Sequence, residues 1–103
     1  MARAEISSGA CGFKTVVIAS KAGSKCELLI ESDCESIRKM AEELTRVEPF
    51  REISFQRENP QALEMGAKYC KHAACPVPVG IIKAVEVEAK LNLPADVTIK
   101  VTK

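Results

Sequence analysis

Hydrophobic and polar residues alternate most clearly over FKTVVIASKAGSKCELLIES, residues 13–32. Residues 13–19 are rich in β-branched side chains, and residues 25–31 alternate apolar with charged side chains. The glycine-containing sequence KAGSK between them is typical of a hairpin turn. The pattern therefore predicts a β-hairpin, with a short extended piece at residues 4–8 before it.

A period of three to four residues replaces this alternation in SDCESIRKMAEELTRV. Ser32 and Glu35 have the spacing of a capping box, and the apolar positions that follow predict a helix as far as Val47. Pro49 ends the pattern. The stretch FREISFQ, residues 50–56, alternates again and predicts a further strand.

Two more helices are predicted in the second half of the chain. Asn59 and Pro60 form a cap and first-turn pair for a helix that continues to about His72. The sequence ACPVPVGIIKAVEVEAKLNLP predicts the next helix, with Cys75 as its cap and Pro76 at its first position.

The last alternating segment, DVTIKVT at residues 96–102, predicts a final strand. The sum is a small α+β protein with the approximate order β-β-α-β-α-α-β. We expect an antiparallel or mixed sheet of about four strands, covered by three helices. No repeat or linker divides the chain, so residues 1–103 are predicted to form a single domain.

Composition and charge exclude two classes of partner. The chain is 28% charged and carries a formal net charge of +1. A nucleic-acid surface would show a clustered basic excess, so we expect no nucleic-acid partner. No apolar run has the length of a signal peptide or a membrane helix, so we expect a cytoplasmic protein without a membrane partner. A protein partner and the oligomeric state stay open.

Five cysteines in a cytoplasmic chain of this size call for an explanation, because disulfides are unusual in that compartment. Cys26 and Cys70 follow apolar patterns, so we predict that they fill the core. Cys11 lies in the loop SGACGF, where the neighbouring glycines leave its side chain accessible. Packing and function explain Cys11 about equally well.

Two further cysteines and the only histidine lie at predicted helix ends. Free amides at a helix start stabilise a thiolate at Cys34, although Cys34 also begins an apolar stripe. Cys75 replaces the usual serine, threonine, aspartate or asparagine cap, which favours a thiolate role. His72 precedes Cys75 by three residues, and is either its neighbour in a site or a partner of the helix dipole.

We therefore predict a metal site formed by Cys11, Cys34, Cys75 and His72, with Cys70 as a substitute for His72. Thiolates with an imidazole suit zinc or an iron–sulfur cluster. Since no motif indicates an enzyme site, a structural or regulatory role is expected. The alternatives are a sulfur-carrier or redox thiol protein that uses Cys75, and an interaction module whose cysteines are incidental.

Two resemblances bear on these positions. The segments CGF, SDC and HAACPVP…IIKA resemble a family of short uncharacterised cysteine-containing proteins over most of the chain. That resemblance implies no established activity, but it emphasises the same three cysteines and the histidine. Locally, CPVP is similar to the CPxP motif of TusA-type sulfur carriers. This implies a persulfide on Cys75 and a helix start shaped by Pro76 and Pro78.

Overall fold

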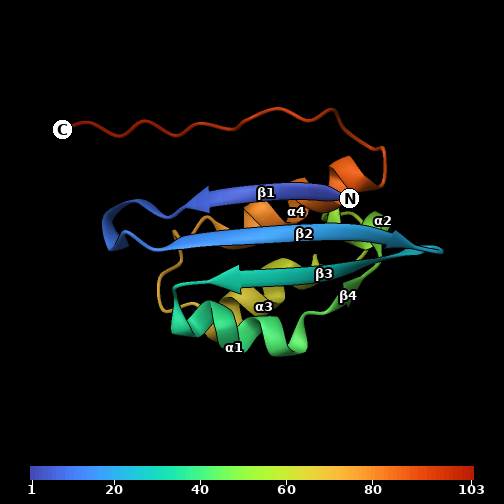
Figure 1. Ribbon diagram of the computed structural model, residues 1–103, viewed down its shortest axis with the longest axis horizontal. Helices are drawn as coiled ribbons and strands as arrows, with labels where there is room; N and C mark the ends of the chain where they lie inside the picture. The colour runs from blue at the N-terminus through green and yellow to red at the C-terminus, as the bar shows by residue number, and fades with distance from the viewer.

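The computed structural model describes residues 1–103 as a four-stranded antiparallel sheet with helices on one face (Figure 1). The strands lie in sheet order β1 (Ala2–Ser7), β2 (Lys14–Ala22), β3 (Lys25–Ser32) and β4 (Arg46–Val47). A 3-10 turn, η1 (Gly9–Cys11), joins β1 to β2. The two residues Gly23 and Ser24 close the β2–β3 hairpin. The predicted α+β class and the hairpin are confirmed.

The helices are α1 (Glu35–Glu43), the one-turn α2 (Pro49–Glu52), α3 (Gln61–Tyr69) and α4 (Val77–Glu88). Figure 1 looks onto the open face of the sheet, with the helices behind it. Helix α4 packs against β1 and β2, α1 packs against β3, and α3 contacts both of these helices. None of the helices is both long enough and apolar enough to cross a membrane.

The core lies between the sheet and the helices, because alternate strand residues point to opposite faces. One row of β2 and β3 points inward and meets the apolar faces of α1 and α4. Cys26 belongs to this row and is fully buried, which confirms its predicted core position. The central buried side chains are Val17, Ala19, Cys26, Leu28, Ile37, Met40, Leu44, Ile81, Ala84 and Val85.

Two glycines allow α4 to approach its neighbours closely. A Cβ atom on Gly80 would overlap the side chain of Ile6 on β1. A Cβ atom on Gly66 of α3 would lie 2.7 Å from Cγ of Pro78 on α4. Each contact holds α4 at a spacing that an alanine would disturb, because packed interiors leave little room for an extra methyl group.

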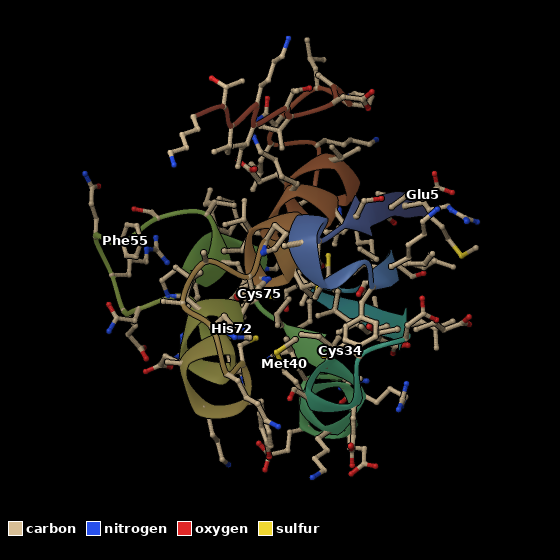
Figure 2. The ribbon with its side chains drawn as sticks, turned by 90° about the vertical axis from the view of Figure 1, so that its left-hand side faces the viewer. Glu5, Cys34, Met40, Phe55, His72 and Cys75 are labelled. Atoms are coloured by element: carbon tan, nitrogen blue, oxygen red, sulfur yellow. The ribbon has the colours of Figure 1, made fainter.

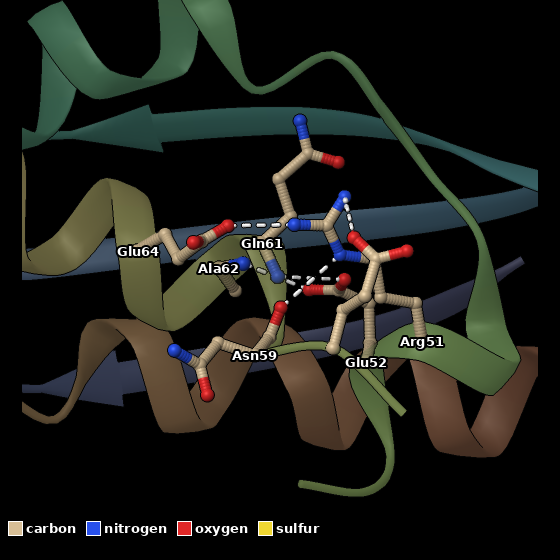
Figure 3. A network of polar contacts seen from close by, with 7 residues as sticks. Arg51, Glu52, Asn59, Gln61, Ala62 and Glu64 are labelled. Atoms are coloured by element: carbon tan, nitrogen blue, oxygen red, sulfur yellow. Dashed lines mark hydrogen bonds and ion pairs between the residues drawn. The ribbon is translucent and has the colours of Figure 1, made fainter. Parts of the chain in front are cut away.

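The predicted strand at residues 50–56 is wrong. Pro49 instead occupies the first turn of α2, where its fixed φ suits a helix. The carboxylate of Glu52 is buried and accepts hydrogen bonds from the backbone N–H groups of Gln61 (2.8 Å) and Ala62 (2.8 Å) at the start of α3 (Figure 3). This cap fixes residue 52 on the helical side of the sheet, so the segment cannot extend as a strand.

The predicted capping box is also wrong. Ser32 is the last residue of β3, and its hydroxyl contacts the hydroxyl of Thr15 at 2.8 Å. Helix α1 begins three residues later, so Cys34 becomes the N-cap and Glu35 the first helical residue. Helix α3 ends at Tyr69, three residues before the predicted end at His72.

The predicted final strand at residues 96–102 does not form. This segment is extended but pairs with no strand. Its apolar side chains Val97, Ile99 and Val101 are 64%, 79% and 85% exposed. Figure 1 shows it running beside the β1 edge and clear of the sheet. The alternation is present, but the chain supplies no partner for it.

Candidate thiol-rich site

A surface pocket of about 630 Å³ at one end of the sheet brings together most of the chain's sulfur chemistry. It lies where η1 follows β1, where α1 follows β3, and beside the loop between α3 and α4. Strands β1 and β3 run in the same direction, so their last residues lie at this same end of the sheet. The chemistry-bearing residues that line the pocket are Cys11, Cys34, Cys70, His72 and Cys75.

Cys11 is the last residue of η1 and is exposed. The flanking residues Gly9 and Gly12 have φ angles of +83° and +73°, in the left-handed region that favours glycine. The Gly12 N–H closes the turn by donating to the Gly9 carbonyl at 2.8 Å. The glycines therefore hold a tight turn that leaves Cys11 at the pocket wall.

Cys34 is half-buried and is the N-cap of α1, whereas the predicted cap at Ser32 would place it at the second helical position. Its N–H donates to the Ser32 hydroxyl at 3.0 Å, and its carbonyl accepts from the Arg38 N–H at 3.0 Å. No side chain caps the first turn of this helix. The thiol of Cys34 thus stands beside free backbone amides, which favour negative charge.

Cys70 and Cys75 stand at the two ends of the short loop between α3 and α4. Cys70 follows the last residue of α3, and its N–H donates to the Gly66 carbonyl at 2.8 Å. The N–H of Cys75 donates to the His72 carbonyl at 3.3 Å. Pro76 is the N-cap of α4, so the prediction that Cys75 caps this helix is wrong. Cys75 instead ends the loop, facing the same pocket as Cys70.

The thiols of Cys70, Cys75 and Cys34 interact electrostatically. Burial, the negative charge and the hydrogen bond of Cys75, and the charge of Cys34 raise the pKa of Cys70 to about 12. Burial is the largest of these causes. The thiolate form of Cys70 is therefore strongly disfavoured, because burial and the neighbouring thiols both oppose a negative charge there.

His72 is exposed, and it lines the pocket together with Glu35, Lys39 and Lys71. Figure 2 shows Cys34, His72 and Cys75 at this end of the molecule, with the thiol residues coming from two separate segments. As the side chains stand, no three of the histidine, cysteine, aspartate and glutamate residues are arranged to hold a metal ion. The pocket gathers the predicted residues, but their side chains do not converge on a common point for a metal ion.

Cys70 packs against the core, as its apolar spacing from Leu63 and Ala67 predicted, but it is only half-buried and also lines the pocket. The signal that points to it is its position five residues before Cys75, at the far end of a loop too short to separate the two. Cys26, by contrast, has no part in the pocket.

Comparison with known proteins gives one match, to a family model. Neither a curated protein nor a solved structure matches the chain. One family model matches residues 2–101, a range that includes all five cysteines and His72. The pocket and most of the extended segment after α4 lie within that range. The chain therefore belongs to the Family of unknown function (DUF6951).

Proposed function

We propose that this protein binds zinc, iron or an iron–sulfur cluster through the thiols of the pocket. The observation that carries the proposal is convergence: four of the five cysteines, from three separate segments, line one surface pocket. The fifth cysteine is in the core, where its thiol fills space. Thiolate donors of this kind select zinc or iron–sulfur clusters.

Cys34, Cys70 and Cys75 are the proposed inner ligands, because their thiols interact in the metal-free protein. Clustered thiolates repel one another, and a bound cation relieves this repulsion. Cys11 is the proposed fourth ligand, from the η1 turn. His72 is the alternative fourth donor at the pocket rim.

Coordination requires the side chains to turn toward a common point. Each cysteine does this by rotation about its single χ1 bond. The pocket volume of about 630 Å³ leaves room for such rotation. The backbone of each segment can therefore stay where it is while the sulfur atoms move.

The bound group would be structural or regulatory. It would tie together three connections from separate parts of the chain: the η1 turn, the start of α1 and the α3–α4 loop. A metal held in this way contributes directly to folding free energy.

The test is the metal and acid-labile sulfide content of untagged protein purified without oxygen, together with its absorption spectrum. We expect either about one zinc per chain, or iron with sulfide and visible absorbance. Cys34→Ser, Cys70→Ser and Cys75→Ser are each expected to lose most of the bound metal.

Cys26→Ala is the matched control, since it also removes one thiol but leaves the pocket untouched. It is expected to retain the metal content of the wild type. Metal-free wild-type protein that takes up neither zinc nor a reconstituted cluster would rule out the proposal.

A second candidate function is a redox or sulfur-carrying dithiol, favoured by the contact between the Cys70 and Cys75 thiols. With hydrogen peroxide, the two thiols would give up two protons and two electrons to form a disulfide, and the peroxide would be reduced to two water molecules. In the sulfur-carrier form, the Cys75 thiolate would take the outer sulfur of a persulfide on a donor protein, and the donor cysteine would leave as its thiolate.

Trypsin cleaves after Lys71, so a Cys70–Cys75 disulfide would join two tryptic peptides that separate on reduction. If the protein acts as a redox dithiol, we expect the two disulfide-linked peptides after treatment with one equivalent of hydrogen peroxide. Oxidation that leaves both thiols free, or that scatters over all five cysteines, would contradict it.

A further inference from the structure

The segment after α4 is extended and apolar on one side, yet its own chain does not cover it. No hydrogen bond involves residues 94–103. The exposed side chains on one side of this segment are Val97, Ile99 and Val101, and they alternate with Thr98, Lys100 and Thr102. Alternation of this kind is typical of a strand with one buried face.

The turn that follows α4 fixes the direction in which this segment leaves. Lys90 adopts a φ of +61°, and its N–H donates to the Val87 carbonyl at 3.1 Å. The Leu91 N–H donates to the Glu86 carbonyl at 2.9 Å, and the side chain of Asn92 accepts from the Leu93 N–H at 2.9 Å. Figure 1 shows the chain turning back beyond this point and running beside the β1 edge without joining the sheet.

The sheet has an unpaired edge on the same side of the molecule. Strand β1 pairs only with β2, so the other edge of Ala2–Ser7 keeps its backbone donors and acceptors free. Ala2, Ala4 and Ile6 point toward α4, whereas Arg3, Glu5 and Ser7 are exposed on the open face. Open edges of this kind template pairing with another strand.

We propose that residues 96–102 of one copy pair with the β1 edge of a second copy, and that the second copy returns the same contact. Each chain carries one unpaired strand segment and one unpaired edge, so a twofold pair satisfies both and leaves no open end. Within its own chain the segment runs beside the β1 edge without forming a hydrogen bond to it, so the edge is left open to the segment of a second copy.

Charge and polarity agree with this pairing. When Lys100 lies opposite Glu5, the apolar side chains Ile99 and Val101 fall on the helix-covered face with Ala4 and Ile6. The threonines of the segment then fall on the open face of the sheet with Arg3 and Ser7. This match holds for either strand direction, because side chains alternate with a period of two. The inference is independent of the metal proposal.

The experiment is sedimentation or light scattering of the full chain under reducing conditions, over a range of concentrations. We expect a dimer for the wild type and at least a tenfold weaker dimer for Ile99→Asp. Thr98→Asp is the matched control, because it adds the same charge on the opposite side of the same segment, and it is expected to remain dimeric. Since residues 94–103 make no hydrogen bonds within their own chain, both variants are expected to keep the wild-type circular dichroism spectrum.

A charge exchange tests the register. Glu5→Lys and Lys100→Glu are each expected to weaken the dimer by about threefold, and the double variant to restore it, since opposed charges on neighbouring strands attract and like charges repel. A wild-type monomer at high concentration would overturn the proposal, as would a dimer that Ile99→Asp leaves unchanged. Equal loss of the dimer in Ile99→Asp and Thr98→Asp would contradict the assigned orientation of the segment.

Isotope-filtered nuclear Overhauser spectra on a mixture of labelled and unlabelled copies distinguish the two possible partners. Contacts between residues 96–102 and β1 are expected between different copies. The same contacts within one copy would show that the strand adds to its own sheet, and would overturn the exchange.

Discussion

At the scale of single residues, two kinds of buried group have opposite requirements. The carboxylate of Glu52 is 1% exposed and has two backbone N–H partners, so its charge is satisfied. The thiol of Cys70 is half-buried among other thiols, and they disfavour its charge. The charge of the first group is satisfied by its hydrogen-bond partners, whereas a charge on the second is opposed by its surroundings.

Glu52→Gln is expected to destabilise the protein. Its side-chain amide would turn one N–H₂ group toward a backbone N–H at the start of α3, leaving a buried donor unsatisfied at a cost of about 1–3 kcal/mol. Chemical denaturation of both proteins measures the difference. Glu58→Gln, at a side chain that is 73% exposed, is the control and is expected to change little. Equal stability of Glu52→Gln and wild type would mean that the cap contributes nothing.

Cys75→Ala is expected to lower the pKa of Cys70 in the metal-free protein, because it removes both the charge and the hydrogen bond of Cys75. Burial remains, so the pKa stays above that of a free thiol. The rate of Cys70 alkylation as a function of pH, followed by mass spectrometry, reports the change. Cys26→Ala should leave the profile of Cys70 unchanged, and an unshifted profile in Cys75→Ala would contradict the proposed contact.

At the scale of elements, the sequence predicts best where alternation and partner lie close together. The β2–β3 hairpin follows from local pattern and a glycine turn, and its register keeps Cys26 and Leu28 inward. Residues 50–56 and 96–102 show the same alternation, yet neither forms a strand. At residues 50–56, Pro49 and the cap from Glu52 impose a helical turn. Residues 96–102 are extended but pair with no strand of the same chain. Local pattern cannot reveal either cause.

Glu88 joins three elements, and its effect on stability should depend on pH. Its carboxylate accepts from the backbone N–H groups of Lys21 (2.8 Å) and Ala2 (2.9 Å), so the end of α4 is tied to β2 and β1. The hydrogen bond from the Lys21 backbone is the main cause that lowers the pKa of Glu88. A lowered carboxylate pKa stabilises the folded state above the pKa of the unfolded chain, and this contribution is lost as the pH falls through the folded value.

Glu88→Gln is therefore expected to be less stable than wild type near neutral pH, with a difference that shrinks in acid. Thermal unfolding from pH 7 down to pH 3 measures this. Glu86→Gln, on the same helix, is the control, and its difference from wild type is expected to vary less with pH. A Glu88→Gln difference that is constant across the range would contradict the assigned linkage.

At the scale of the whole molecule, the pocket depends on topology more than on any motif. Cys11 and Cys34 lie 23 positions apart in the sequence. They line the same pocket because β1 and β3 terminate at the same end of the sheet. Local context singled out Cys11, Cys34, Cys75 and His72 one by one, and the structure places all four in the lining of one pocket. Their convergence, and the inclusion of Cys70, required the order of the strands and the shortness of the α3–α4 loop. A sequence pattern states neither.

Zinc affinity of the reduced protein is expected to rise with pH. Cys70 has a pKa raised to about 12, so metal binding near neutral pH must displace its proton. Affinity should therefore increase about tenfold per pH unit for each thiol proton displaced. Competition with a chromophoric chelator between pH 6 and pH 8 measures the slope, and a Cys70→Ser variant is expected to show a smaller one. A slope of zero would exclude thiol ligands that are protonated in the free protein.

The close approach of Gly66 and Pro78 affects the thiols of Cys70 and Cys75, although neither thiol takes part in that contact. Gly66 lies four residues before Cys70, and Pro78 lies three residues after Cys75, so the contact brackets the loop that carries both. A methyl group at residue 66 would act as a wedge between α3 and α4, and would widen the separation of the sulfur atoms from a distance. Pro78, the second proline of CPVP, thus sets the spacing of the two thiols through packing alone, although it carries no reactive group.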